Sequence, residues 1–290
     1  MTTGPSVPER VRRLAEQGRE GRDWLAGLPS LVDELARRWA LSIGPAFDHA
    51  GHTAVVLPAE RRDGTPAVLK LPFPHMEGLD EAAGLRFWDG DPTVRLLEVD
   101  TERGALLLER CLPGHDLKTL QDEERDHVLA GLLRRLWLPD KPEMGFRHLE
   151  QMIAYWSEES ERDADRWPDP AIVREGLDVW RELARPSEDD VLLATDAHAG
   201  NVLAASRAPW LLIDPKPFVG DRAYDATQHL FDARERLEAD PLGFVRHWSA
   251  LLGLEEERVR AWTFARYAAE RRDDDDEWRR ANALARRLAS

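Results

Sequence analysis

Two carboxylates and one carboxamide stand out in the second half of the chain because of their spacing. Asn201 follows Asp196 by five residues, and Asp214 follows Asn201 by thirteen. Short apolar runs flank them, so we expect Asp196 and Asn201 in a loop between two strands and Asp214 at the end of the next strand. Carboxylate and amide oxygens suit Mg²⁺, a hard cation that keeps water and substrate phosphates among its ligands. The spacing is therefore compatible with metal-assisted chemistry at a phosphate.

The elements that must position these residues can be predicted from apolar periodicity. Strand-like runs occupy residues 191–194, 202–204 and 210–213. Leucine and tryptophan stripes at helical spacing surround them, and we interpret these stripes as core packing. They fall within residues 128–137, 149–156 and 173–180. The second half is therefore predicted to be mainly helical, with a short interruption that carries the polar residues.

The first half predicts a small sheet. Residues 8–41 are predicted to be helical, with Ser30 as an approximate N-cap before an apolar face. Asp63-Gly64 is a turn signal between two apolar runs and predicts a hairpin. The hairpin and the apolar runs that follow it in the chain predict a sheet of about five strands with one inserted helix. The runs are residues 54–57, 67–71, 94–99 and 105–109, and the inserted helix spans residues 77–88.

Composition excludes several classes of protein. Forty Lys and Arg against 55 Asp and Glu give 290 residues a net charge of −15. Such a charge argues against nucleic-acid binding and suits a cationic small molecule, although solubility alone would also explain it. Cys111 is the single cysteine, so an intramolecular disulfide or a multi-cysteine metal site is excluded. We find no membrane-length apolar run and no signal-peptide pattern, and expect a cytoplasmic protein.

The spacing of Asp196, Asn201 and Asp214 resembles the catalytic loop and metal-binding segment of the protein-kinase-like fold. The amino-acid sequence is most similar to the aminoglycoside phosphotransferase superfamily, in the branch of streptomycin 6-kinases and hydroxyurea phosphotransferases. The stretches that carry the branch resemblance are DWLAGLP at residues 23–29, GTPAVLK at 64–70, LLER at 107–110, WLLIDPKP at 210–217 and RAWTFAR at 260–266.

The resemblance implies roles for the three residues and two cofactors. Asp196 would be the catalytic base that accepts the proton of an acceptor hydroxyl. Asn201 and Asp214 would hold Mg²⁺, which neutralises charge on the phosphates. The phosphate donor would be ATP, with GTP as the alternative.

It also implies a nucleotide-binding set in the first half. Lys70 would contact the α- and β-phosphates, with Glu81 on the following helix as its partner and Glu77 as a competitor for that role. The adenine edge would pair with the backbone carbonyl of Glu109 and the backbone amide of Cys111. Cys111 would thus mark the segment whose backbone pairs with adenine and would not be a nucleophile, since nothing in the sequence indicates an activated thiol.

The chain departs from the superfamily pattern in three places. Ala194-Thr195 stands where a His-Gly usually precedes the catalytic Asp, so the rigidity of the loop is in question. Pro-Lys-Pro follows Asp214 in place of Phe-Gly. The predicted phosphate-covering loop at residues 48–53 has a single glycine, Gly51, and lacks GxGxxG.

Three further polar residues remain open. His198 is expected to hold the loop by hydrogen bonds in preference to binding a metal. Lys216 would contact either a phosphate or a carboxylate. Asp225 would either cap a helix or brace the catalytic loop.

We therefore expect an α+β, bilobal protein-kinase-like fold that is a small-molecule kinase. Residues 1–110 would form the small lobe, and residues 111–290 the helical lobe with catalytic loop 194–203 and metal-binding segment 210–217. The acceptor would be a streptomycin-like aminoglycoside, hydroxyurea or another metabolite. The alternatives are a nucleotide-binding pseudokinase without catalysis and a metal-dependent hydrolase that uses Asp196, His198 and Asp214 as ligands. Oligomeric state is not predicted.

Overall fold

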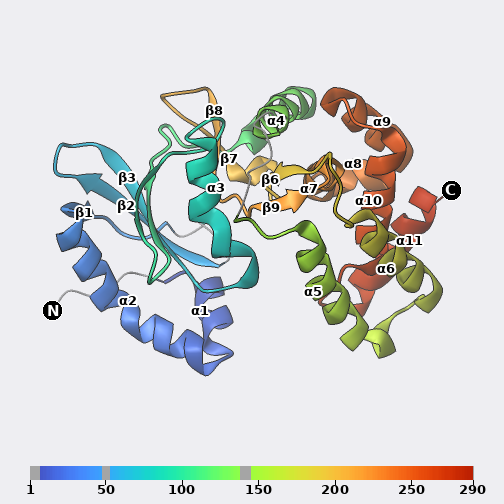
Figure 1. Cartoon of the computed structure of the whole chain (residues 1–290), viewed down its shortest axis with the longest axis horizontal. Coiled ribbons are helices and arrows are strands. Elements are labelled where there is room, and N and C mark those ends of the chain that lie inside the picture. Colours follow the sequence, from blue (N-terminus) through green and yellow to red (C-terminus); the bar gives the residue numbers. More distant parts are fainter. Residues whose placement is uncertain (1–6, 48–52, 138–144, 290) are drawn as a thin grey trace. The chain divides into compact units, whose positions relative to one another are not determined.

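The structure is a computed structural model that describes residues 7–47, 53–137 and 145–289. The chain divides into two compact units (Figure 1). The first unit comprises Met1–Gly114 together with Ala204–Leu211, and the second comprises His115–Leu203 together with Leu212–Ser290. The tip of one hairpin in the second half of the chain thus belongs to the first unit.

The first unit is built on a five-stranded antiparallel sheet in the order β1-β2-β3-β5-β4. Its elements are α1 (Glu9–Glu16), α2 (Arg19–Arg38), β1 (Leu41–Ile43), β2 (Ala54–Arg61), β3 (Pro66–Pro72), the 3₁₀ helix η1 (Met76–Asp80), α3 (Glu81–Trp88), β4 (Leu96–Asp100) and β5 (Ala105–Glu109). The predicted hairpin is β2 and β3, with Gly64 at φ 82° in its turn.

The two faces of this sheet are covered by different helices (Figure 1). Alternate residues of β2 and β3, such as Leu57 and Leu69, pack with Leu28 and Leu35 of α2 in one apolar core. Side chains along a strand alternate between faces, so Lys70 points away from this core. Helix α3 lies on the Lys70 side, where its residue Glu81 meets the lysine.

The N-terminal helical region, predicted to span residues 8–41, ends earlier than predicted, with α2 finishing at Arg38. Leu41–Ile43 is not helical but forms edge strand β1, because Ala40 adopts a left-handed φ of 52° and turns the chain toward β2. Ser30 is not an N-cap, since it lies inside α2, which begins at Arg19 after Gly18. The apolar stripe of α2 continues past Pro29, and its burial outweighs the helix-breaking tendency of the proline.

The second unit is mainly helical. Its helices are η2 (Leu117–Thr119), α4 (Asp122–Leu136), α5 (Leu149–Arg162), η3 (Ala164–Arg166), α6 (Pro170–Leu183), η4 (Ala199–Asn201), α7 (Arg222–Asp232), α8 (Arg234–Ala239), α9 (Pro241–Leu252), α10 (Glu256–Ala269) and α11 (Asp275–Ala289). Helix α10 packs against α6, α7, α9 and α11. Trp180, Trp248, Trp262 and Trp278 are almost fully buried in this unit, so these tryptophans are core residues.

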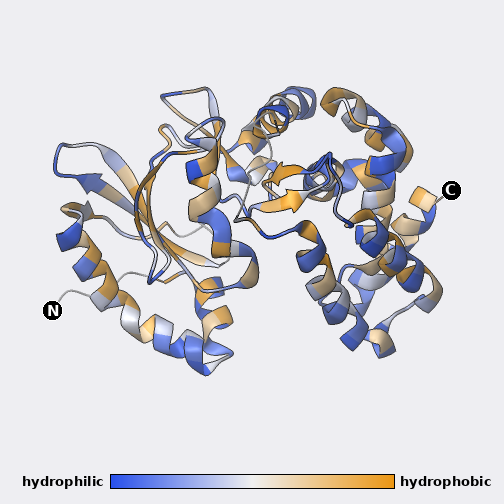
Figure 2. Ribbon diagram, viewed as in Figure 1, coloured by the Kyte–Doolittle hydropathy of each residue, from blue (hydrophilic) through white to orange (hydrophobic). Residues whose placement is uncertain are grey.

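Four short strands interrupt the helices of the second half. They are β6 (Val191–Leu193), β7 (Val202–Ala204), β8 (Trp210–Leu212) and β9 (Phe218–Gly220). Strand β7 pairs with β8, and β6 pairs antiparallel with β9. The sequence did not predict β9. Figure 2 shows β6 and β9 as hydrophobic, and both are buried. Between these strands run the segments that carry Asp196, Asn201 and Asp214.

Within the described ranges, no helix combines the length and the apolar character needed to cross a bilayer.

Candidate active site

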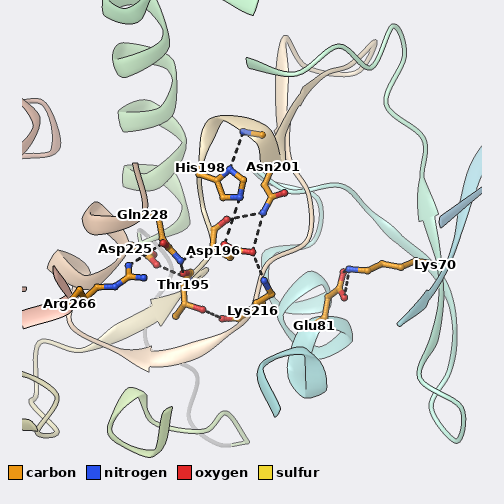
Figure 3. A network of polar contacts seen from close by, with 11 residues as sticks. Lys70, Glu81, Thr195, Asp196, His198, Asn201, Lys216, Asp225, Gln228 and Arg266 are labelled. Carbon is orange, nitrogen blue, oxygen red and sulfur yellow. Dashed lines mark hydrogen bonds and ion pairs between the residues drawn. The ribbon is translucent and has the colours of Figure 1, made fainter. Parts of the chain in front are cut away.

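In the first unit, Lys70 and Glu81 form a buried ion pair. Lys70 Nζ lies 2.6 Å from both carboxylate oxygens of Glu81. Lys70 is 7% exposed and Glu81 3% exposed, so each charge depends on the other for its stabilisation. The pair predicted from the sequence is therefore present, with the ammonium fixed on the sheet face that α3 covers (Figure 3).

At the end of β5, Glu109 is held by its side chain. Arg207 Nε and Nη2 donate to its two carboxylate oxygens at 2.9 Å each, and the Arg95 amide donates at 3.1 Å. Burial alone would raise the pKa of Glu109, but these donors lower it below its ordinary value. No pattern in the sequence indicates Arg207, whose side chain links the tip of the β7–β8 hairpin to Glu109 at the end of β5.

Cys111 lies two residues farther on and is 8% exposed. Burial raises the pKa of its thiol to about 12, with the charge of Glu109 adding to the effect. The thiol therefore stays protonated at neutral pH and is a poor nucleophile. The predicted phosphate-covering loop at 48–53 falls largely on residues 48–52, which lie outside the described residues.

In the second unit, Asp196 and Asn201 are neighbours in the loop between β6 and β7 (Figure 3). Asn201 Nδ2 donates to the backbone carbonyl of Asp196 at 3.0 Å and to its Oδ2 at 3.3 Å. The Asn201 backbone carbonyl accepts the amide of Ile213 at 2.8 Å, so the end of β8 is tied to the same turn. Asp214, with a left-handed φ of 53°, follows directly.

This arrangement fits a hard cation. With its amide nitrogen directed at Asp196, the side chain of Asn201 must turn its carbonyl oxygen away from that residue. That oxygen and the carboxylate of Asp214 are the donor types that Mg²⁺ prefers, and Mg²⁺ takes few protein ligands beside phosphates and water. Among the described residues, no group of three or more His, Cys, Asp or Glu could hold a metal.

His198 holds the turn of the loop. Its Nδ1 accepts the amide of Gly200 at 3.1 Å, and its Nε2 lies 3.8 Å from Asp196 Oδ1. The hydrogen bond to Gly200 is the structural contact expected from the sequence.

Lys216 pairs with a carboxylate. Its Nζ donates to Asp196 Oδ2, and its backbone amide donates to the Ala194 carbonyl at 2.8 Å. Thr195 Oγ1 in turn donates to the Lys216 carbonyl at 2.6 Å. Of the two options left open for Lys216, the structure shows the contact with a carboxylate, and that carboxylate belongs to Asp196.

Asp225 on α7 holds the start of the catalytic loop by hydrogen bonds. It is fully buried on α7 and accepts the amides of Ala194 at 3.1 Å and Thr195 at 2.7 Å. Trp137 Nε1 donates to it at 2.9 Å. Burial raises the pKa of Asp225 to about 6, although these three donors oppose the shift. The cap of α7 is Asp221, which accepts the amide of Ala223.

Two residues of this network were missed from the sequence. Gln228 lies one helical turn after Asp225 on α7, and its amide nitrogen donates to the Thr195 carbonyl. Arg266 on α10 donates to Gln228 Oε1 at 3.1 Å. The three-residue spacing of Asp225 and Gln228 places them on one helix face and was the available signal. No sequence signal pairs either residue with Arg266, because the contact joins two distant helices.

Comparison with known proteins decides the family. The model of the aminoglycoside/hydroxyurea antibiotic resistance kinases matches residues 38–275. The chain belongs to this family. The kinase is 39% identical to a streptomycin 6-kinase of Streptomyces glaucescens over 259 residues, which cover 86% of the chain and 83% of that protein. It is 41% identical to a hydroxyurea phosphotransferase of Kitasatospora aureofaciens over 261 residues, which cover 88% and 75%.

Solved structures agree on the fold of the kinase. A choline kinase from Streptococcus pneumoniae superposes with a TM-score of 0.62 at 11% identity, covering 89% of this chain and 98% of that one. An ethanolamine kinase from Plasmodium vivax superposes with a TM-score of 0.60 at 11% identity, covering 98% and 96%. The predicted α+β, protein-kinase-like fold and the predicted phosphotransferase family are confirmed.

Proposed function

We propose that the kinase transfers the γ-phosphate of Mg-ATP to a hydroxyl group of a streptomycin-like aminoglycoside or of hydroxyurea. The observation that carries the proposal is the carboxylate of Asp196, fixed by Asn201 at 3.3 Å in a loop whose spacing is that of a kinase catalytic loop. Membership of the antibiotic resistance kinase family supports the acceptor class.

Asp196 acts on the acceptor hydroxyl. The hydroxyl oxygen forms a bond to the γ-phosphorus while the bond from that phosphorus to the bridging oxygen breaks and ADP leaves. The hydroxyl proton passes to the Asp196 carboxylate. Asn201 and Lys216 donate to Oδ2 of this carboxylate, so its orientation is set before the acceptor binds.

Asn201 and Asp214 would hold the magnesium ion. When bound there, Mg²⁺ neutralises negative charge on the β- and γ-phosphates. Because Asn201 also fixes Asp196, one side chain links the position of the base to the metal-binding segment. Replacement of Asn201 should therefore affect metal dependence and turnover together.

The nucleotide-binding roles fall on the first unit. Lys70 would contact the α- and β-phosphates, with Glu81 keeping the ammonium in place. The backbone carbonyl of Glu109 and the backbone amide of Cys111 would pair with the adenine edge. Arg207 supports this role because it fixes the Glu109 side chain at the end of β5.

The acceptor is a small molecule of one of two kinds. A cationic aminoglycoside suits a chain with a net charge of −15, because the protein's field attracts cations. Hydroxyurea is neutral and gains nothing from that field, so transfer to hydroxyurea should depend less on ionic strength.

The deciding experiment measures phosphoryl transfer from Mg-ATP and Mg-GTP to streptomycin, other aminoglycosides and hydroxyurea. Asp196→Ala is compared with Asp189→Ala, which replaces an exposed aspartate seven residues upstream. We expect transfer to one acceptor, lowered at least about 100-fold by Asp196→Ala and unchanged by the control.

Other results would change the proposal in defined ways. ATP binding without transfer to any acceptor of the panel would favour the pseudokinase or a kinase of another metabolite. Full activity of Asp196→Ala would remove the role assigned to this residue.

A further inference from the structure

The carboxylate of Asp196 is contacted from the side of α7 by a glutamine. Gln228 Nε2 donates to the Thr195 carbonyl, the oxygen of the peptide bond that joins Thr195 to Asp196, and lies 3.5 Å from Asp196 Oδ1. Asn201 and Lys216 contact the other oxygen, Oδ2. The two oxygens of the proposed base are thus approached by different donors from different segments (Figure 3).

The orientation of Gln228 is set by a buried arginine. Arg266 is 5% exposed, and its Nη1 lies 3.1 Å from Gln228 Oε1 and 2.6 Å from Thr227 Oγ1. A guanidinium only donates hydrogen bonds, so it must face the carbonyl oxygen of the glutamine amide. The NH₂ group of Gln228 is therefore directed at Thr195 and Asp196.

Arg266 itself has little freedom to move. Its Nε lies 2.9 Å from Glu270 Oε2, and its guanidinium carbon lies 4.2 Å from the ring centre of Phe231 and 5.0 Å from that of Tyr224. The arginine is thus fixed by an ion pair and by two aromatic rings. The hydrogen bond from Arg266 Nη1 to Gln228 Oε1 therefore restricts the orientation of the Gln228 side chain.

The peptide that Gln228 holds has a strained neighbour. Thr195 has a left-handed φ of 47°, which is unfavourable for a β-branched residue. Such a conformation persists only where the surroundings enforce it. Without the bond from Gln228, the Thr195–Asp196 peptide could relax and turn the carboxylate away from its productive direction.

We propose that Gln228, oriented by Arg266, is the positioning residue that keeps the Asp196 carboxylate directed at the acceptor hydroxyl. This inference rests on the proposed role of Asp196 as the base. Gln228 acts through Asp196 and takes no part in proton transfer itself. Its loss should therefore lower turnover and leave nucleotide binding unchanged.

The test is a double-mutant cycle between Gln228→Leu and Asp196→Ala, measured as kcat and KM for phosphoryl transfer. In the wild-type background, Gln228→Leu should lower kcat about 10- to 100-fold, because small misplacements of a reacting group have effects of this size. The KM for ATP should change less than about twofold, since the variant leaves the proposed nucleotide contacts in place. In the Asp196→Ala background, Gln228→Leu should have no further effect.

Two matched variants separate positioning from stability. Gln228→Glu retains an oxygen for Arg266 but loses the donor to Thr195 and Asp196, so it should lower kcat while the fold is kept. Thr227→Val removes a different side-chain acceptor of Arg266, the Thr227 hydroxyl, and leaves Gln228 and Glu270 in place. It should lower the melting temperature and retain most of kcat.

The outcomes are distinguishable. Equal losses from Gln228→Leu in both backgrounds would overturn the positioning role, and so would wild-type kcat in Gln228→Leu or in Gln228→Glu. If Asp196→Ala alone retained full activity, the proposed base would fail first, whatever Gln228 does.

Discussion

Trp137 Nε1 donates a hydrogen bond of 2.9 Å to Oδ2 of Asp225, and this contact joins the end of α4 to the carboxylate beneath the catalytic loop. The same oxygen accepts the Ala194 amide, and the other oxygen accepts the Thr195 amide. One buried carboxylate therefore satisfies three donors from two segments. Its loss would leave all three without their acceptor in the core.

We expect Asp225→Ala to lower the free energy of unfolding by about 3 kcal/mol, the usual scale for breaking a buried charged network. Turnover should fall as well, because the amides of Ala194 and Thr195 would no longer be held. Urea denaturation and steady-state kinetics measure the two effects. Wild-type stability in this variant would show that the three hydrogen bonds contribute little.

The pH dependence of stability provides a separate test of Asp225. Its pKa in the folded protein is about 6, above the ordinary value of 3.8, so the folded state holds this proton more tightly than the unfolded state does. The contribution of Asp225 to stability is therefore greatest at low pH and falls as the pH rises to about 6. We expect the difference in unfolding free energy between wild type and Asp225→Asn, measured by urea denaturation, to fall as the pH rises from about 4 to about 6. Above pH 6 the difference should stay constant.

Thr195 lets the backbone and side-chain contributions be separated. Thr195→Ser keeps the hydroxyl that donates to the Lys216 carbonyl, and we expect nearly wild-type stability and turnover. Thr195→Val keeps the shape but removes the hydroxyl that donates to that carbonyl, which should lower the free energy of unfolding by about 1–2 kcal/mol. Equal stability of the Ser and Val variants in urea denaturation would contradict the role of the hydroxyl.

Lys70 and Glu81 should affect nucleotide binding. Lys70→Met removes the ammonium proposed to contact phosphates, so the KM for ATP should rise about tenfold or more, the loss expected for one charged hydrogen bond. Glu81→Gln removes the negative charge that lies 2.6 Å from the buried ammonium of Lys70, so it should weaken ATP binding and lower stability. Arg246→Met, which replaces an exposed cation of α9, is the control. An unchanged affinity for ATP in Lys70→Met, measured by calorimetry, would exclude the phosphate contact.

Kinetics of Lys216 variants can distinguish contact with Asp196 from contact with the nucleotide. Because its ammonium contacts Asp196 Oδ2, Lys216→Met should lower kcat about 10- to 100-fold with little change in the KM for ATP. Lys216→Arg retains a cation and should recover part of the loss. If Lys216→Met instead raised the KM for ATP and left kcat unchanged, the lysine would act on the nucleotide and not on the base.

Asp126 forms a second buried cluster in the helical unit. Arg236 donates to both of its carboxylate oxygens at 2.9 and 2.7 Å, and His229 Nε2 lies 2.7 Å from Oδ1. Burial alone would raise the pKa of Asp126, but the hydrogen bonds from Arg236 and His229 hold it well below its usual range. Its stabilising contribution is therefore present above the ordinary aspartate pKa and is lost as the pH falls through the lower folded-state value.

We expect Asp126→Asn to lower the free energy of unfolding by about 3 kcal/mol at pH 7. The difference from wild type should shrink as the pH falls below about 4, where the unfolded chain takes up its proton and the folded carboxylate does not. Asp178→Asn, on the exposed side of α6, is the control. A difference that stays constant down to acid pH would contradict the assigned direction of the pKa.

The sequence by itself determined the elements that local patterns encode. Short apolar runs predicted β2, β3, β4 and β5, and the apolar runs on either side of Asp196 predicted β6 and β7, between which the proposed base lies. The two short strands β1 and β9 were not predicted from the sequence. Their pairing with β2 and β6 is what makes them strands.

Only the tertiary structure decided which side chains surround the base. The spacing of Asp196, Asn201 and Asp214 follows from local sequence, since strands and turns fix distances over a few residues. Gln228 and Arg266 lie 32 and 70 residues beyond Asp196, on helices whose packing brings them to the loop. Such contacts depend on the packing of α7 against α10, and no periodicity within one segment encodes that packing.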